Sequence, residues 1–298
     1  MADAIFGFLN IDKPPDLTSH DVVARVRRLC RQSVGKTKVG HAGTLDPMAT
    51  GVLVICLGHA TRLSEYAMQS TKTYRATVHF GIETDTYDAE GTVTAQTDAS
   101  QITLAQVEEA LPAFIGDIQQ LPPMYSAIKR GGKKLYELAR EGVEIEREAR
   151  PVTIHQIDII DWQAPHLTLD VTCGAGTYIR SLAYDLGQAL GVGAHLSALI
   201  RSHSGAFAVT DAVNLAQLLD DPDWQRHIIT PEHALTDWQR LELTAEQADD
   251  VQLGRFITKT DVLADAYVMA YMPDGHLLAV LENQGNQWKP HKVFLPQS

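Results

Sequence analysis

Apolar residues between positions 22 and 30 recur three or four residues apart, which places them on one face of a helix. Ser19 stands just before this segment and is the expected N-cap, while Asp21 falls in the first turn, where the helix dipole favours an anion. We therefore expect a helix from about residue 19, with an apolar face made of Val22, Val23, Val26, Leu29 and Cys30.

From Thr71 to Gly81 apolar and polar residues alternate, which is typical of a strand with one buried face. A short helix is expected at residues 104–115, and two strands at 152–162 and 167–173. Another helix follows the glycine turn at 174–176, with Thr177 as its expected cap. Because helices and strands mix irregularly, we predict an α+β fold with a mixed, mainly antiparallel sheet. The first strand is expected to bury Tyr74, Ala76, Val78 and Phe80.

The pattern changes around Pro231. Beyond it we expect a short helix ended by Gly254, a hairpin that turns at residues 273–275, and a final strand at 288–294. A small, mostly β domain is therefore predicted at residues 241–298, after a larger domain at residues 1–235. Within the larger domain, a segment at about 120–150 begins as an extended Pro-Pro stretch, crosses a glycine pair and is expected to become helical at 135–140.

Charge is distributed unevenly along the 298 residues. The net charge of −12 argues against a nucleic-acid partner, but residues 205–298 hold 14 acidic and only 6 basic residues. Screening limits each charge to about 8 Å at physiological salt, so local patches matter more than the total. From charge alone, two basic patches are either nucleic-acid contacts or solvated surface: Arg25, Arg27, Arg28, Arg31, Lys36 and Lys38, and Lys129, Arg130, Lys133 and Lys134.

Composition excludes several classes of protein. Cys30, Cys56 and Cys173 show neither Cys-x-x-Cys spacing nor a metal-like cluster, which fits a reducing cytosol. The N-terminus lacks the basic region and long apolar core of a secretory signal. A membrane span at residues 39–61 would bury Asp46 and Pro47 in lipid, so we reject it. We predict a cytoplasmic protein with no membrane or metal partner.

Asp46 is the only charged side chain between Lys38 and Arg62, in a stretch of small residues that precedes the apolar run Gly51–Leu57. An Asp-Pro pair is usually a turn, and that interpretation stays open. The alternative is a functional carboxylate that small neighbours leave accessible to a substrate. A poorly solvated carboxylate needs a cation, or it takes up a proton.

Two further candidate residues, Arg180 and Tyr74, each have two interpretations. Arg180 either pairs with Asp46 or forms a surface pair with Asp185. Tyr74 is either a core aromatic or a flat platform for a nucleobase. His41 on its own fits a turn residue. The chain lacks a P-loop, a dinucleotide fingerprint and a Ser or Cys triad pattern, so we expect carboxylate chemistry without a cofactor.

Between about Gly7 and Phe207, five segments that follow one another in the family's order resemble the TruB family, the tRNA pseudouridine-55 synthases. GHAGTLDPMATGVLVICLGHATRL is similar to the active-site motif of the family, and NIDKPPDLTSHDVV to its N-terminal segment. KTYRATVHFGIETDTYDAEG resembles the strand with the active-site tyrosine. LPPMYSAIKRGGKKLYELAREG resembles the RNA-gripping insertion, and GTYIRSLAYDLGQALGVGAHLSAL the arginine motif. The resemblance implies a pseudouridine synthase fold at residues 1–235 and a PUA domain at 241–298.

The resemblance also implies roles for individual residues. Asp46 attacks the uridine, at ribose C1′ or at C6 of the base, and Arg180 pairs with Asp46 to keep it ionised. Tyr74 stacks on the target base and takes part in moving the C5 proton. The remaining implied substrate contacts are Tyr178 and Leu199 as pocket walls, His41 under the RNA loop, and Lys129 and Arg130 on phosphates.

The implied partner is the T-arm of tRNA, bound by a monomer. The target base must leave its stack, which costs a few kcal/mol, and the basic patches then become phosphate contacts. Two other functions remain open: an RNA-folding chaperone with incidental catalysis, and a guide-RNA-dependent relative that acts on ribosomal RNA.

The sequence departs from the family pattern at three places. Asp16 stands where glycine is common, and we expect little effect because aspartate tolerates similar turn backbones. Gly174 and Ala175 replace a common Ser-Lys, and Ile200 replaces a common arginine. The last two changes remove positive charge near the RNA path and bear on affinity rather than on chemistry.

Overall fold

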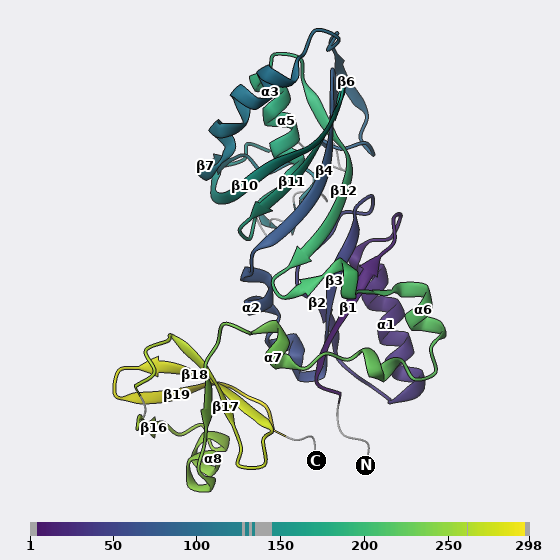
Figure 1. Cartoon of the computed structure of the whole chain (residues 1–298). Coiled ribbons are helices and arrows are strands. Elements are labelled where there is room, and N and C mark those ends of the chain that lie inside the picture. Colours follow the sequence, from purple (N-terminus) through teal and green to yellow (C-terminus); the bar gives the residue numbers. More distant parts are fainter. Residues whose placement is uncertain (1–4, 127–128, 131–132, 135–144, 261, 296–298) are drawn as a thin grey trace.

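The computed structural model describes residues 5–126, 129–130, 133–134, 145–260 and 262–295. A ten-stranded sheet forms the larger part of the molecule, in the order β14-β1-β3-β12-β4-β11-β10-β7, with β13 on β12 and β2 on β3 (Figure 1). The pairs β1–β14 and β3–β12 are parallel, and the others are antiparallel. The strands are β1 (Gly7–Lys13), β2 (Val39–His41), β3 (Thr50–Leu57), β4 (Lys72–Phe80), β7 (Gly116–Gln120), β10 (Arg150–Gln163), β11 (His166–Cys173), β12 (Ala194–Ser204), β13 (Phe207–Ala208) and β14 (Val213–Asn214).

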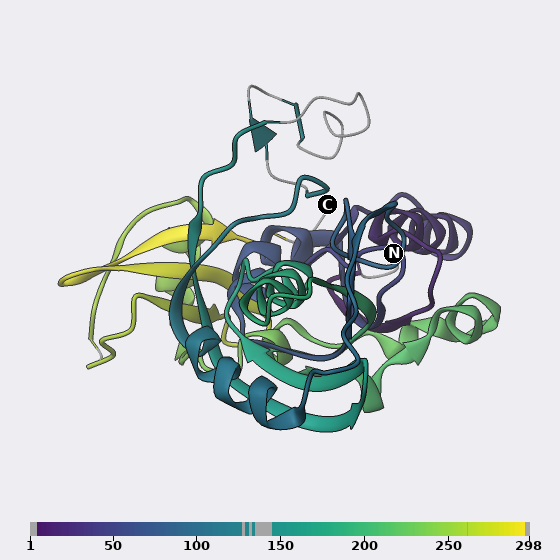
Figure 2. The ribbon, with the colours of Figure 1, turned by 90° about the horizontal axis from the view of Figure 1, so that it is seen from above.

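Four helices contribute to a single core on one face of this sheet. They are α1 (Ser19–Ser33) and α6 (Leu215–Asp220) at one end, and α3 (Leu104–Ala110) and α5 (Ile179–Ala189) at the other. Seen from above, α5 lies against the curved strands (Figure 2). Since α5 carries Arg180 at its start, this packing fixes the position of that side chain relative to the sheet.

Strand β3 has apolar side chains on both faces because both faces are covered. Leu53, Ile55 and Leu57 join the helix-covered core. Val52 and Val54 belong to a second cluster, together with residues of the C-terminal sheet. The apolar run Gly51–Leu57 is thus a doubly buried strand, which lacks the alternation of a half-buried one.

The C-terminal sheet has the order β15-β17-β18-β19-β16. The prediction of a mostly β unit is confirmed here, with the expected hairpin turn at 273–275 and a helix that ends before Gly254, whose φ is +74°. Its elements are β15 (Arg240–Glu242), α8 (Ala245–Gln252), β16 (Ile257–Thr258), β17 (Tyr267–Tyr271), β18 (Leu277–Gln284) and β19 (Gln287–Val293). The smaller elements elsewhere are α2 (Ser64–Gln69), β5 (Ile82–Thr84), β6 (Val93–Gln96), β8 (Lys129–Arg130), β9 (Lys133–Lys134) and α7 (Pro231–Ala234).

The predicted α+β class and the alternation in β4 are confirmed. Both predicted caps are wrong. Thr18 caps α1 and forms a capping box with Asp21. Tyr178 occupies the N-cap position of α5 without a side-chain cap, while the Thr177 hydroxyl donates to Gly174 O. The expected helix at 104–115 ends as α3 at residue 110 and continues as a 3₁₀ turn with proline near its start. The expected helix at 135–140 lies outside the described residues. In the described part of the chain, no helix is long and apolar enough to cross a membrane.

Asp16 stands where glycine is common in the family, and we expect this difference to have little effect. Its φ is +63°, and its N–H donates to Pro47 O at 3.0 Å. Because alanine is strained in this conformation, Asp16→Ala is expected to lower the free energy of unfolding by about 1 kcal/mol. Asp16→Gly relieves strain but adds freedom to the unfolded chain, so it is expected to stay within about 0.5 kcal/mol of wild type. Urea unfolding measures both, and equal losses in the two variants would contradict the prediction.

Candidate active site

Asp46 lies on the loop between β2 and β3, and buried polar side chains from three distant segments hold this loop. The Lys13 ammonium donates to three carbonyl oxygens, those of Pro14, Leu17 and Pro47, at 2.9, 2.7 and 3.0 Å. Lys13 is fully buried, and this burial lowers the pKa of its ammonium to about 8. Its bond to Pro47 O anchors the residue that follows Asp46.

Ser19 and Arg201 hold the other side of the loop. The Ser19 hydroxyl donates to Leu45 O at 3.0 Å and accepts from Leu45 N–H at 2.8 Å. The Arg201 guanidinium donates to Gly43 O, Thr44 O and Val52 O, at 3.0, 3.3 and 2.7 Å. With Lys13, these contacts fix the backbone on both sides of Asp46, so the direction of its carboxylate is set before any substrate binds.

The Arg180 guanidinium lies against the Asp46 carboxylate in a two-pronged ion pair. Nε is 3.0 Å from Oδ2, and Nη2 is 3.2 Å from Oδ1. Nη2 also donates to Tyr125 O at 2.8 Å, and Nη1 donates to Thr86 O at 3.2 Å. Because the fork has five N–H groups, only one remains for a further partner.

That last partner is Asp88, which sequence reasoning missed. Its Oδ2 accepts from Arg180 Nη1 at 3.1 Å, and its side chain is 4% exposed. Its Oδ1 accepts from the Thr86 hydroxyl at 2.6 Å and from Glu90 N–H at 3.1 Å. Arg180 therefore bridges a sealed carboxylate and one that reaches solvent.

The difference in exposure gives the two carboxylates different capabilities. The Asp46 side chain keeps 34% of its surface exposed, so a substrate can reach it. The protein around the Asp46 carboxyl keeps water from solvating its charge, which raises the pKa of this carboxyl above its ordinary value. The Arg180 guanidinium opposes that shift. An anion that is held in place yet poorly solvated is the form in which a carboxylate attacks carbon.

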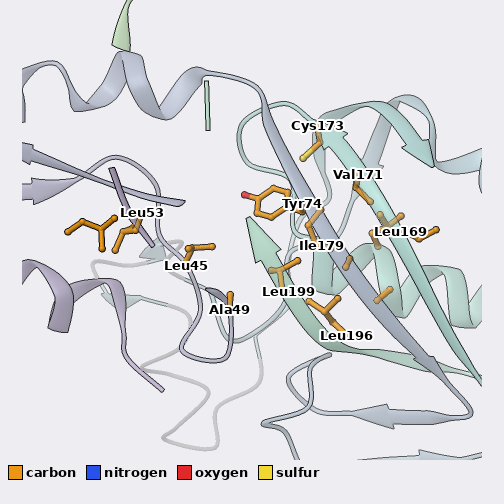
Figure 3. Close-up of a cluster of buried hydrophobic side chains, with 14 of the residues drawn as sticks. Leu45, Ala49, Leu53, Tyr74, Leu169, Val171, Cys173, Ile179, Leu196 and Leu199 are labelled. Carbon is orange, nitrogen blue, oxygen red and sulfur yellow. The ribbon is translucent and has the colours of Figure 1, made fainter. Parts of the chain in front are cut away.

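Tyr74 and Tyr178 lie within electrostatic range of the Asp46 carboxylate, and Leu199 shares an apolar cluster with Leu45, the residue before Asp46. Tyr74 is 9% exposed, and its ring lies in one apolar cluster with Leu45, Ala49 and Leu199 (Figure 3). Burial raises the pKa of the Tyr74 hydroxyl, while the neighbouring Arg201 guanidinium opposes the shift. The Tyr178 backbone is fixed by Gln120, which accepts from its N–H at 2.7 Å and donates to its carbonyl at 3.0 Å.

The remaining candidates are His41 and the basic residues. His41 ends β2, and burial lowers the pKa of its imidazole. Among the described residues, its buried Nδ1 has no hydrogen-bond partner. Lys129 and Arg130 form the short strand β8, and their side chains lie outside the described residues. All six basic residues of the first patch are exposed.

The sequence held a signal for one of the missed residues. Leu199 was a predicted pocket wall, and in a strand the side chain two residues later shares its face. Leu199 and Arg201 are both buried on β12, whereas Ile200 between them is 41% exposed. Neither Lys13 nor Asp88 stands two residues from a predicted site residue, so the same argument could not find them. Within the described ranges, no group of three or more His, Cys, Asp or Glu side chains is arranged to hold a metal ion.

Comparison with family models covers most of the chain. Residues 31–179 match the TruB family pseudouridylate synthase N-terminal domain. Residues 180–237 match the tRNA pseudouridylate synthase B C-terminal domain. Residues 238–295 match the C-terminal model of tRNA pseudouridine synthase II.

Individual relatives give the same picture. The chain is 48% identical to tRNA pseudouridine synthase B of Symbiobacterium thermophilum over 85% of this chain and 83% of that protein. It is 43% identical to tRNA pseudouridine synthase B of Dehalococcoides mccartyi over 97% of this chain and 96% of that protein. Among solved structures, a chain of a Cbf5–Nop10–Gar1 complex superposes with a TM-score of 0.73 at 26% identity, over 98% of this chain and 85% of that one. The predicted fold family is confirmed by these matches.

Proposed function

Because the chain belongs to the TruB family of pseudouridine synthases, we propose that this isomerase converts the uridine at position 55 in the T-loop of tRNA to pseudouridine. The observation that carries the proposal is the Asp46 carboxylate, gripped by Arg180 on one side and one-third exposed on the other. This geometry supports Asp46 as the nucleophile, since its exposed side is free for a substrate carbon while the ion pair fixes its orientation.

The reaction breaks the N1–C1′ bond of uridine and joins C5 to C1′; the proton on C5 leaves and N1 gains one. The base must therefore detach, turn and reattach while the enzyme holds it. Base flipping costs a few kcal/mol, which contacts in the pocket must offset. Tyr74 supplies an aromatic face for the flipped base, and Leu199 and Tyr178 supply walls. None of these steps requires a cofactor.

The proposed partner is the T-arm of tRNA, bound by a cytoplasmic monomer. Residues 1–235 are the proposed catalytic domain, with an RNA-gripping segment at about 120–150 that includes Lys129 and Arg130. Residues 241–298 are the proposed PUA-like RNA-binding domain. His41 is proposed to support the RNA loop that the target nucleotide has left.

The deciding experiment is incubation of the purified chain with an unmodified tRNA transcript, followed by position-specific detection of pseudouridine. Product at position 55 with protein and tRNA alone supports the whole proposal. Product at another position would overturn the assigned site, and activity that requires added guide RNA would favour the guide-dependent alternative.

The contribution of the Tyr74 hydroxyl can be measured separately from that of the Tyr74 ring. Tyr74→Phe keeps the flat ring, so tRNA affinity is expected to stay within a few-fold of wild type. It removes the hydroxyl that lies beside Arg201, and the single-turnover rate is expected to fall by about 100-fold or more, as is typical when a proton-transfer group is lost. Rapid-quench measurement of product provides the rate. Unchanged kinetics would reduce the hydroxyl to a bystander.

The basic face of α1 is expected to contact phosphates. Arg25 and Arg28 are exposed, so replacing both with glutamine is expected to weaken tRNA binding and to lower the slope of log affinity against log salt by up to about 2. Filter binding at several salt concentrations measures the slope. Arg226→Gln is the control, because Arg226 is exposed but belongs to an ion pair with Asp221. Equal slopes in all three proteins would remove α1 from the RNA path.

A further inference from the structure

Two tyrosines outside the proposed chemistry stack on each other next to the Asp88–Arg180 contact. Tyr87 lies in the loop after β5 and Tyr184 lies on α5, and both are half-buried. Their ring centroids are 4.0 Å apart, and the ring planes differ by 17°. This is a close stack between a loop and a helix that are far apart in the sequence.

Both residues are direct neighbours of the ion-pair network. Tyr184 follows Arg180 by four residues, so the two side chains lie on the same face of α5, one turn apart. Tyr87 immediately precedes Asp88. The helix thus holds two successive loop residues, one through an ion pair and the other through an aromatic stack.

The loop backbone needs such support. Tyr87 has a φ of +63°, a conformation that bulky residues rarely adopt. The Tyr87 carbonyl accepts from Leu196 N–H at 3.0 Å, and Ala89 N–H donates to Leu196 O at 3.0 Å, so the loop is also tied to β12 on either side of Asp88. With its backbone fixed at these points and its ring fixed by Tyr184, residue 87 leaves Asp88 only a narrow range of positions.

We propose that Tyr87 and Tyr184 are positioning residues, whose stack keeps Asp88 on Arg180 and thereby holds Arg180 against Asp46. The proposal rests on the proposed function for its effect on rate, but its geometric part is independent of activity. Neither tyrosine is among the residues proposed above to contact the substrate. A displacement of about 1 Å in groups that orient a nucleophile is enough to slow a reaction by about 100-fold.

The test compares Tyr184→Ala, Tyr184→Phe and the control Tyr66→Ala. Tyr66 is also a half-buried tyrosine in an aromatic cluster, but it packs on Trp238 and Tyr267, away from the Asp88 loop. Tyr184→Ala is expected to slow single-turnover pseudouridine formation roughly 10- to 100-fold, with tRNA affinity within about twofold of wild type. Tyr184→Phe keeps the stack and is expected to stay within about threefold. Tyr66→Ala is expected to lower the melting temperature without this loss of rate.

A double-mutant cycle separates positioning from general packing. If Tyr184 acts through Asp88, then Tyr184→Ala adds no further loss of rate in an Asp88→Asn background. Additive losses, or a wild-type rate in Tyr184→Ala, overturn the proposal.

A crystal structure of Tyr184→Ala decides the geometric part whether or not the wild-type chain makes pseudouridine. Separation of Asp88 Oδ2 from Arg180 Nη1 beyond hydrogen-bond distance supports the inference, and a retained contact overturns it. Failure of the wild-type enzyme on tRNA would instead contradict the proposed function.

Discussion

Asp46→Asn is expected to lose pseudouridine formation by at least about 10⁴-fold while it binds tRNA within a few-fold of wild type. The amide has nearly the shape of the carboxylate but is no nucleophile, so the loss falls on the chemical step. The fold should tolerate the change, because Arg180 keeps its ion pair with Asp88 and its bonds to two backbone carbonyls. Burial also raises the pKa of Asp46, so the ionised side chain lowers the free energy of unfolding at neutral pH. Asparagine carries no charge and avoids this cost, so the variant is expected to melt no lower than wild type.

Single-turnover conversion of an unmodified transcript measures the loss, and filter binding measures the retained affinity. A wild-type rate in pure Asp46→Asn protein would remove Asp46 as nucleophile. The same variant separates catalysis from RNA chaperoning: its effect on tRNA refolding, compared with a control without protein, reports chaperoning alone.

The fold was predictable where one local pattern decides it. In β4 a single buried face produces alternation from Tyr74 to Phe80, and the structure has that face against the core. The apolar run of β3 was ambiguous between a strand and other buried segments. Its other face belongs to a cluster that also holds Phe207, Met269 and Tyr271, more than 150 residues later in the chain, and no local pattern reports such a cover.

The cap of α1 shows a missed local signal. Thr18 and Ser19 both carry hydroxyls, but only Thr18 stands three residues before Asp21, the spacing of a capping box. Ser19 instead points inward and holds Leu45 next to the candidate nucleophile. A residue assigned to local helix chemistry therefore supports the site.

The site itself was predictable only in part. Asp46 is conspicuous as the one charge in an uncharged stretch. Arg180 was one candidate partner from the residues alone, and the resemblance favoured it. Asp88 and Lys13 were not found, because each acts through a contact that the chain makes only when folded: Asp88 with a guanidinium 92 residues away, and Lys13 with a carbonyl 34 residues away. Arg201 was not singled out as a candidate either, although its burial makes it a support of the Asp46 loop.

Arg180→Met is expected to lower both the free energy of unfolding and the reaction rate, because Arg180 forms ion pairs with both Asp46 and Asp88. Asp88 is sealed from solvent, and removing its partner leaves a buried charge, which typically costs about 3–5 kcal/mol of unfolding free energy. Asp46 loses the group that opposes the effect of burial, so its pKa rises further. The rate depends on the ionised form and falls as pH drops through this pKa. The acid limb of the kcat profile therefore moves to higher pH, and the rate at pH 7 is expected to fall more than about 100-fold.

The matched control for Arg180→Met is the same deletion in an exposed Arg–Asp pair. Arg75 bonds Asp170 through Nη2 at 2.7 Å, but the two side chains are 50% and 27% exposed. Water replaces a lost partner there, so Arg75→Met is expected to cost at most about 1 kcal/mol and to leave the pH profile of kcat unchanged. Urea unfolding and single-turnover rates between pH 5 and 9 measure both variants. If Arg180→Met kept the wild-type acid limb while Asp46 remained essential, Arg180 would orient the carboxylate without lowering its pKa. An arginine that lowers the pKa of Asp46 must shift the acid limb when it is removed, whereas one that only orients the carboxylate leaves the limb in place.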